Sequence, residues 1–244
     1  MFRFYITITC CCWLLSLGSK AQTNKSIKAN QQIWFGYMTS APINSRYSLW
    51  NDFHFVPKGF WVARTGITRN WDNVTFTGGF AYLGLPVSAN NKSLKRNEYR
   101  PWAQITWNTT TRSHLSFNTR IRYDARFRQK VLEGELTDDY PFTNRMRLAF
   151  SARYTFNPDS KKFPLFTQVG SEFLLNFGKE VTYHTFDQLR INVTLGVKRK
   201  KLTIQSGYMY RLVQTGPVSY VGNHTILCWV NHQIDWFQTE DSRK

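Results

Sequence analysis

Closely spaced arginines are the most chemically informative feature of the sequence. From residue 113 to 128 every second position is polar, and four of these positions are arginine, with Asp124 among them. Residues 144–156 carry three more arginines in the same alternation. Guanidinium groups bind carboxylates in forked pairs, whereas rings of like charge around a pore select ions of opposite charge. The arginines therefore predict either a network that braces a folded interior or a constriction that attracts anions.

Acidic residues accompany the arginines and favour the bracing interpretation. An unpaired charge inside a folded protein is costly, and Glu98 and Glu172 lie in segments that alternate in the same way. Both roles are compatible if the surplus positive charge lines a water-filled path. The predicted charge network comprises Glu98, Arg100, Arg120, Arg122, Asp124, Arg126, Arg128, Arg145, Arg147, Arg153, Glu172 and Arg190.

A histidine and a serine two residues apart raise the question of hydrolysis. In His114-Leu115-Ser116 both polar side chains share one face of an extended strand, where an imidazole can act as base for a hydroxyl. A hydrolase of membrane lipid needs this pair on the lipid-facing surface, whereas here it shares the polar face with Arg120. We therefore predict no enzymatic activity, and a lipid or ester hydrolase using His114 and Ser116 is kept as an alternative.

Metal and nucleic-acid binding have little support in the sequence. The five histidines show no His-x-x-x-His spacing and no Cys-x-x-Cys pair is present, so we predict no metal site and no cofactor. Residues 198–201 are all basic, but elsewhere basic and aromatic side chains alternate onto opposite faces. Nucleic-acid binders interleave them on one accessible face. We predict a solvated turn at 198–201 and no nucleic-acid partner.

The elements that position these residues are β-strands. From 113 to 128 apolar and polar residues alternate strictly, a pattern that a helix would scramble and a strand sorts onto two faces. Similar alternation predicts eleven strands and no helix. The expected strands are residues 31–38, 47–55, 60–70, 74–84, 98–107, 113–128, 144–156, 165–177, 186–197, 202–213 and 225–237.

Connections between the expected strands alternate in length. The longer ones are 85–97, 129–142, 178–184 and 215–223, and the shorter ones are 108–112, 157–163 and 198–201. A meander through a bilayer has short turns on one side and longer loops on the other. We predict an all-β, closed, antiparallel up-and-down transmembrane β-barrel of about twelve strands, with ten as the fallback. An even number leaves both chain ends on one side of the membrane.

The overall composition is basic and rich in aromatic residues. The 244 residues include 32 Lys and Arg against 15 Asp and Glu, a net charge of +17, together with 9 Trp, 12 Tyr and 19 Phe. A mean hydropathy of −0.43 leaves no room for several apolar helices of about 20 residues. The aromatic and apolar content argues against intrinsic disorder. Helical membrane proteins and disordered chains are therefore excluded.

The first residues predict export. Arg3 supplies a positive charge, residues 4–17 form an apolar run, and Ser19-Lys20-Ala21 is a small-x-small cleavage site. The run is shorter than the roughly 20 residues that a membrane anchor needs. We expect a cleaved signal peptide at 1–21 and a single β-barrel domain at 22–244. Only Cys228 would remain after cleavage, so no internal disulfide is expected.

Alternation fits a soluble β protein as well as a membrane barrel, because the two differ only in which face is apolar. Several expected strands of 12 to 16 residues exceed the length usual in soluble sheets, and arginine replaces lysine on the polar face. Tryptophans near strand ends suggest interfacial girdles; they are Trp34, Trp50, Trp61, Trp71, Trp102, Trp107, Trp229 and Trp236. We therefore favour the membrane, and a soluble periplasmic β-barrel that binds a ligand is the alternative.

Four segments follow one another in the sequence: Glu98-Tyr-Arg100-Pro-Trp102-Ala-Gln104, Arg120-Ile-Arg122-Tyr-Asp124-Ala-Arg126-Phe, Arg145-Met-Arg147-Leu and Glu172-Phe-Leu-Leu-Asn176. Together they resemble an uncharacterised, domain-of-unknown-function family of Gram-negative outer-membrane β-barrels. The family usually has Glu in place of Asp124 and Gln in place of Ala103. The resemblance implies an outer-membrane location, with lipids and the barrel-assembly machinery as partners, and it supplies no catalytic residues.

The expected function follows from the barrel and its charged face. We expect a porin-like outer-membrane protein that is either structural or a passive pore for small solutes, with an arginine-rich lumen that prefers anions. The pattern specifies no oligomeric state.

Overall fold

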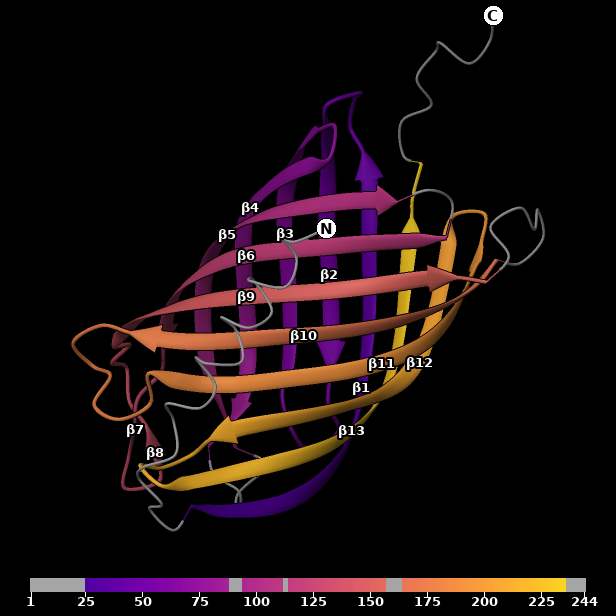
Figure 1. The fold of residues 1–244 in the computed structure, drawn as a ribbon. Helices are drawn as coiled ribbons and strands as arrows, with labels where there is room; N and C mark the ends of the chain where they lie inside the picture. The colour runs from indigo at the N-terminus through magenta and orange to yellow at the C-terminus, as the bar shows by residue number, and fades with distance from the viewer. Residues whose placement is uncertain (1–24, 88–93, 112–113, 157–163, 236–244) are drawn as a thin grey trace, which may run out of the picture.

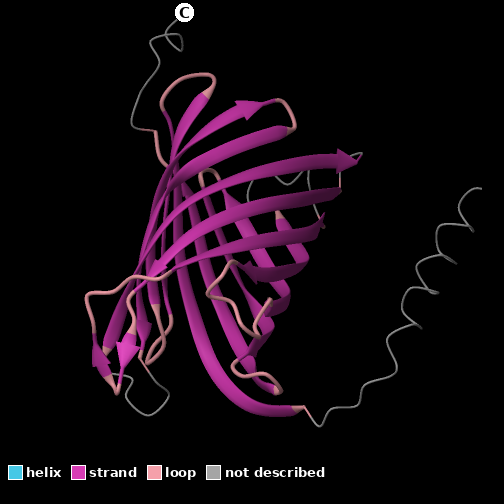
Figure 2. Cartoon of the chain, turned by 90° about the vertical axis from the view of Figure 1, so that its left-hand side faces the viewer, coloured by secondary structure: helices cyan, strands magenta, loops and turns pink. Residues whose placement is uncertain are grey.

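The computed structural model describes residues 25–87, 94–111, 114–156 and 164–235, and within them all regular structure is β-strand (Figures 1 and 2). The barrel strands are β1 (Ser26–Pro42), β2 (Tyr47–Phe55), β3 (Trp61–Trp71), β4 (Val74–Pro86), β5 (Lys95–Thr111), β6 (Leu115–Arg128), β9 (Phe142–Thr155), β10 (Leu165–Phe177), β11 (Phe186–Arg199), β12 (Leu202–Gln214) and β13 (Ser219–Gln233). Two short strands, β7 (Val131–Leu132) and β8 (Glu135–Leu136), form a separate sheet between β6 and β9. In this part of the chain no helix has the length and hydropathy to span a bilayer.

The eleven barrel strands close in the order β1-β13-β12-β11-β10-β9-β6-β5-β4-β3-β2. Each corresponds to one of the eleven segments whose alternation predicts a strand, so the closed all-β barrel is confirmed. The expectation of twelve strands in fully antiparallel closure needs correction for the described residues. An odd meander brings its first and last strands together in the same direction, and β1 pairs with β13 in parallel, from Ser26↔Ser219 to Ser40↔Gln233. The start of β1 and the end of β13 therefore lie at opposite ends of the barrel (Figure 1).

The connections sort onto the two ends of the barrel as the meander requires. At one end of the barrel, which we call the loop end, β2 connects to β3, β4 to β5, β6 to β9, β10 to β11 and β12 to β13. At the opposite end, which we call the turn end, β1 connects to β2, β3 to β4, β5 to β6, β9 to β10 and β11 to β12. The four longer connections predicted around 85–97, 129–142, 178–184 and 215–223 all join strands at the loop end.

The first strand is shared unequally by its two neighbours. Phe35–Pro42 pairs with β2, whereas the preceding residues of β1 pair only with β13. The turn 56–60 between β2 and β3 folds inward there: Val56 is 1% exposed and packs with Phe60 and Trp34. This turn thereby adds apolar side chains to one side of the lumen.

Apolar side chains face outward and polar side chains face inward. Ile121, Phe150 and Val193 lie on the outer surface and are 48%, 52% and 48% exposed. Their neighbours in sequence point into the barrel, and Arg122 and Thr194 are 1% and 2% exposed. A water-soluble barrel has the opposite arrangement. The facing of the strands thus does not favour the soluble alternative.

Candidate functional site

Inward positions on the barrel strands carry more arginines than acids. The lumen-facing acids are Asp52, Glu98, Asp124, Glu172 and Asp187. The lumen-facing arginines are Arg64, Arg96, Arg100, Arg120, Arg122, Arg126, Arg128, Arg145, Arg147, Arg153, Arg190 and Arg211. Each of these acids lies within ion-pair distance of at least one arginine. The surplus therefore consists of arginines that share an acid or have none.

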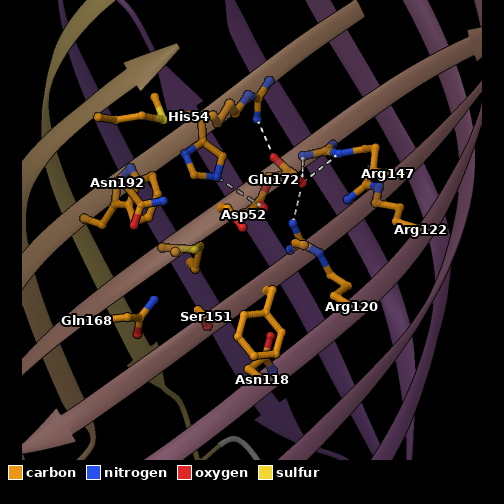
Figure 3. A pocket seen from close by; sticks show the side chains of 18 of the residues that line it. Asp52, His54, Asn118, Arg120, Arg122, Arg147, Ser151, Gln168, Glu172 and Asn192 are labelled. Carbon is orange, nitrogen blue, oxygen red and sulfur yellow. Dashed lines mark hydrogen bonds and ion pairs between the residues drawn. The ribbon is translucent and has the colours of Figure 1, made fainter. Parts of the chain in front are cut away.

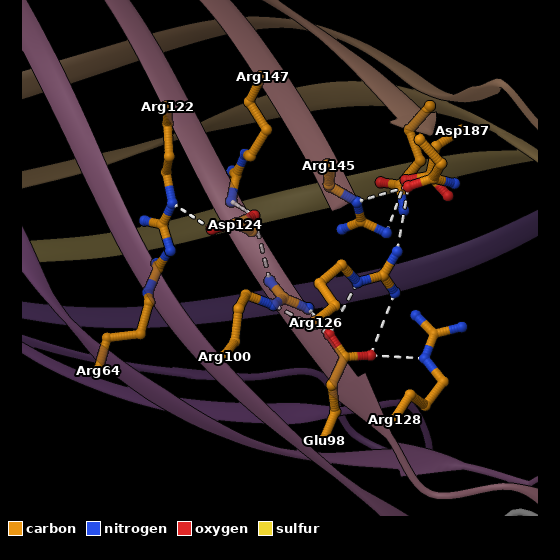
Figure 4. Close-up of polar contacts among 12 residues, drawn as sticks. Arg64, Glu98, Arg100, Arg122, Asp124, Arg126, Arg128, Arg145, Arg147 and Asp187 are labelled. Atoms are coloured by element: carbon orange, nitrogen blue, oxygen red, sulfur yellow. Dashed lines mark hydrogen bonds and ion pairs between the residues drawn. The ribbon is translucent and has the colours of Figure 1, made fainter. Parts of the chain in front are cut away.

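Glu98 on β5 joins three arginines toward the loop end (Figure 4). Arg126 donates two parallel hydrogen bonds, from Nε to Oε1 at 2.9 Å and from Nη2 to Oε2 at 3.1 Å. Arg128 Nε donates to Oε2 at 2.5 Å, and Arg100 donates to Oε1. Because Glu98 is fully buried, these charge-assisted bonds replace its lost hydration and tie β5 to β6.

Asp124 on β6 interacts with three arginines in the lumen. Arg122 Nε donates to its Oδ1 at 2.7 Å, while Arg100 Nη1 and Arg147 Nη1 lie 3.6 and 3.7 Å from Oδ2. The guanidinium of Arg122 also lies over the Trp102 ring, 4.2 Å from the ring centroid. The alternation of β6 places Arg122 and Asp124 on one face, so the pair forms within a single strand.

Glu172 on β10 collects arginines from three other strands (Figure 3). Arg120 Nη2 of β6 lies 2.6 Å from Oε1, Arg147 Nη2 of β9 lies 2.7 Å from the same oxygen, and Arg190 Nη1 of β11 lies 2.9 Å from Oε2. One carboxylate is thus paired with three guanidinium groups, which leaves a local excess of positive charge in this part of the lumen.

Asp187 reaches the lumen through a β-bulge. The β10–β11 register steps from Leu174↔Gln188 to Leu175↔Phe186, which leaves Asp187 unpaired between them. A bulge redirects a side chain, and Asp187 Oδ2 lies 2.9 Å from Arg145 Nη2. The sequence carries no signal for this bulge, so alternation alone does not identify Asp187.

Four side chains from β1, β2 and β3 form a linked chain. Trp34 Nε1 donates to His54 Nδ1 at 3.1 Å, and His54 Nε2 lies 3.4 Å from Asp52 Oδ2. Arg64 binds the same carboxylate with Nε at 2.7 Å and Nη2 at 2.6 Å. Because His54 Nδ1 accepts a hydrogen bond, its proton lies on Nε2 and faces Asp52.

The lumen contains three cavities that adjoin one another. The turn-end cavity has a volume of about 230 Å³, the middle cavity about 110 Å³ and the loop-end cavity about 270 Å³. The turn-end and middle cavities share the lining residues Trp34, Arg64, Arg147 and Arg190. The middle and loop-end cavities share Arg126 and Arg128. Arginine side chains therefore lie at both partitions between the cavities.

The twelve residues of the predicted charge network all occupy inward positions. Eleven of them form the ion pairs described above, whereas Arg153 donates to Gln168 Oε1 at 2.9 and 3.1 Å. Their role in selecting solutes stays a prediction. The residues not foreseen are Asp52, His54, Arg64, Arg96, Asp187 and Arg211. Of these, His54 and Arg211 lie between apolar neighbours in expected strands, a signal that could have identified them.

The girdle prediction is wrong for several tryptophans. Those that face the lumen are Trp34, Trp50, Trp102 and Trp229. Trp34 and Trp102 are 5% and 4% exposed, and a guanidinium group lies over each ring inside the barrel. Trp71 and Trp107 lie outward, 46% and 60% exposed. Trp236 lies outside the described residues.

The structure does not bring His114 and Ser116 together into a catalytic pair. His114 lies in the turn before β6, donates from Nδ1 to the backbone carbonyl of Thr155 at 2.9 Å and stacks on Tyr154. Within the described ranges no hydrogen bond joins His114 to Ser116, and no group of three His, Cys, Asp or Glu side chains is placed to hold a metal ion.

The fold and the site define a class: a closed β-barrel with an apolar outer surface and an arginine-lined lumen. Residues 31–220 match the family described as a protein of unknown function (DUF2490), and the chain belongs to that family. This assignment confirms the resemblance to an uncharacterised barrel family. No curated protein matches the chain. A solved structure described as the NanC porin in a rhombohedral crystal form is similar, with a TM-score of 0.43 and 16% identity over 77% of this chain and 90% of that chain.

Proposed function

We propose that this protein is an outer-membrane β-barrel, exported by a signal peptide at residues 1–21 and formed by residues 22–244. The support is the outward row of apolar side chains, exemplified by Ile121, Phe150 and Val193, which suits contact with lipid. Its partners are then the outer-membrane lipids and the barrel-assembly machinery. The residues of the signal peptide lie outside the described part of the chain.

The location has a direct test. The protein should stay in the membrane fraction when membranes are washed with carbonate at high pH, and the mature chain should begin at Gln22 by mass spectrometry. Release by carbonate without detergent would contradict the membrane assignment. An N-terminus at Met1 would contradict the signal peptide and leave the barrel in the membrane unaffected.

We further propose that the lumen is a narrow, passive path that prefers anions. The observation that carries this proposal is the arginine surplus, since one carboxylate such as Glu172 binds three guanidinium groups. Positive side chains that line a path attract anions and exclude cations. The small cavity volumes and the arginine partitions between them indicate low conductance rather than a wide channel.

Planar-bilayer recording tests the path and its selectivity. With a gradient of KCl, the reversal potential should lie toward the equilibrium potential of chloride. A reversal potential on the potassium side would contradict the anion preference. Absence of any conductance would contradict the path itself and leave the second candidate, a purely structural barrel.

The structural barrel is favoured by one specific observation. Glu98 and Asp124 are fully buried and bound by arginines on two or more strands, so the network braces the wall whether or not solutes pass. We propose no enzymatic role in either case. A Ser116→Ala variant should therefore behave as the wild type in lipid and ester hydrolysis assays, and a loss of hydrolysis confined to that variant would reverse this view.

A further inference from the structure

The middle cavity has two chemically different walls. Its apolar lining consists of Trp34, Phe60, Val62, Leu83 and Leu85. Its charged lining consists of Arg64, Arg100, Arg126, Arg128, Arg145, Arg147, Arg190 and Arg211. Gln188 is the other lining residue, and no acid lines this cavity among the described residues. A cavity so lined suits a molecule that is anionic at one end and apolar at the other.

The apolar wall belongs to the buried core of the barrel. Val62 and Leu83 pack in one buried cluster, Trp34 packs in another, and Phe60 contacts both. These side chains come from β1, β3, β4 and the inward turn 56–60, whereas most of the arginines come from β5, β6, β9, β11 and β12. The two kinds of lining thus come mainly from different halves of the barrel.

Arg211 differs from the other arginines of this cavity. Each of the others lies within 4.0 Å of a carboxylate, whereas Arg211 has no such partner in the described part of the chain. Its Nη2 donates to Gln32 Oε1 at 3.1 Å and its Nε has no hydrogen-bond partner. The guanidinium lies over Phe60 and Trp34, 5.6 and 5.7 Å from the ring centroids. Arg211 is only 9% exposed, and its guanidinium therefore lies beside the apolar wall without a directly bound carboxylate.

We propose that the middle cavity binds a small organic anion, a carboxylate with a short aliphatic or single-ring body, and that Arg211 holds the carboxylate. The apolar body contacts Phe60, Leu83 and Leu85. Binding supplies a directly bound carboxylate to Arg211 and gives its Nε, which has no hydrogen-bond partner, an acceptor. This inference rests on the proposed anion-preferring lumen and narrows it to a class of solute.

Calorimetry on the detergent-solubilised protein tests the ligand class. The probes are acetate, butyrate and hexanoate, with chloride, neutral hexanamide and cationic hexylamine as comparisons. Affinity should rise from acetate to hexanoate because each added methylene finds apolar lining, and hexanamide and hexylamine should bind far more weakly. Equal affinity for acetate and hexanoate, or binding of hexanamide as tight as that of hexanoate, would overturn the proposal.

Matched variants test the assignment of Arg211. Arg211→Gln should weaken hexanoate binding about tenfold or more, the size expected for loss of a charged hydrogen bond. Arg153→Gln is the control, because Arg153 is also a lumen arginine with no carboxylate partner in the described ranges, but it does not line the cavity. Each variant removes one positive charge, and both are measured in the same detergent. Equal weakening by both variants, or by neither, would contradict the role of Arg211.

The apolar wall has its own variant. Leu85→Gln changes a half-buried side chain and should reduce hexanoate affinity toward that of acetate while leaving acetate unchanged. If hexanoate affinity is unaltered, the apolar contact is refuted. If these binding tests fail, the anion preference measured by bilayer recording can still hold. If bilayer recording instead shows a preference for cations, the proposed function itself is contradicted, so the two failures are distinguishable.

Discussion

The guanidinium of Arg122 lies against the indole of Trp102, 4.2 Å from the ring centroid, and both side chains are buried. Trp102 on β5 is the register partner of Asp124 on β6, and Asp124 accepts a hydrogen bond from Arg122. A cation, an aromatic face and a carboxylate thus meet inside the barrel wall, where water does not screen them. The contribution of these contacts to the stability of the barrel can be measured by substituting Trp102.

Removing a tryptophan ring that contacts an arginine should lower the stability of the barrel more when the ring lies in the lumen than when it lies on the outer surface. A desolvated cation–π contact stabilises by about 2 kcal/mol and an exposed one by about 0.5–1 kcal/mol. Trp102→Leu should therefore lower the free energy of unfolding in urea by about 2 kcal/mol or more. Trp71→Leu is the control, since Arg69 lies 4.3 Å from its exposed ring. Equal losses in the two variants would show that the buried contact adds nothing special.

Neutralising Glu98 should destabilise the barrel strongly. Glu98→Gln leaves Arg100, Arg126 and Arg128 without their shared carboxylate, and breaking a buried ion pair costs about 3–5 kcal/mol. The measurement is unfolding by urea in detergent or lipid. Glu135→Gln, an exposed change on β8 outside the barrel, should leave stability unaltered. A stable Glu98→Gln variant would indicate that the network is dispensable for the fold.

A charge on the outer face should reveal the surrounding solvent. Val193 lies midway along β11 and faces outward, so Val193→Arg should destabilise the protein in lipid by about 2–4 kcal/mol. Ile27→Arg, at the start of β1, should cost about 1 kcal/mol or less because it lies near the edge of the barrel. If both arginines are tolerated equally, the outer face does not meet lipid.

Releasing the arginines around Glu172 should sharpen the anion preference. Glu172→Gln removes one negative charge beside Arg120, Arg147 and Arg190, so the reversal potential in a KCl gradient should move further toward that of chloride. The comparison is Glu135→Gln, which changes the same charge outside the lumen. A shift of equal size in both variants would mean that the selectivity arises from overall charge and not from the lumen.

Much of the candidate site follows from alternation along single strands. Arg120, Arg122 and Asp124 share a face because side chains alternate along a strand, and that relation needs no knowledge of neighbouring strands. Arg211 obeys the same rule, yet its lack of a carboxylate partner depends on what β1, β11 and β13 place around it. The bulge at Asp187 and the inward facing of Trp34 likewise depend on pairing between distant segments.

The sequence by itself determined the strands, their two faces and the segregation of arginines from apolar side chains, because these properties are local and repeat every two residues. Tertiary structure alone decided that the apolar face points outward, that β1 closes on β13 in parallel, and that arginines lie at the partitions between three cavities. These features arise from register and closure, in which residues far apart in the chain satisfy each other's hydrogen bonds and charges. No local pattern encodes which partner each residue will meet.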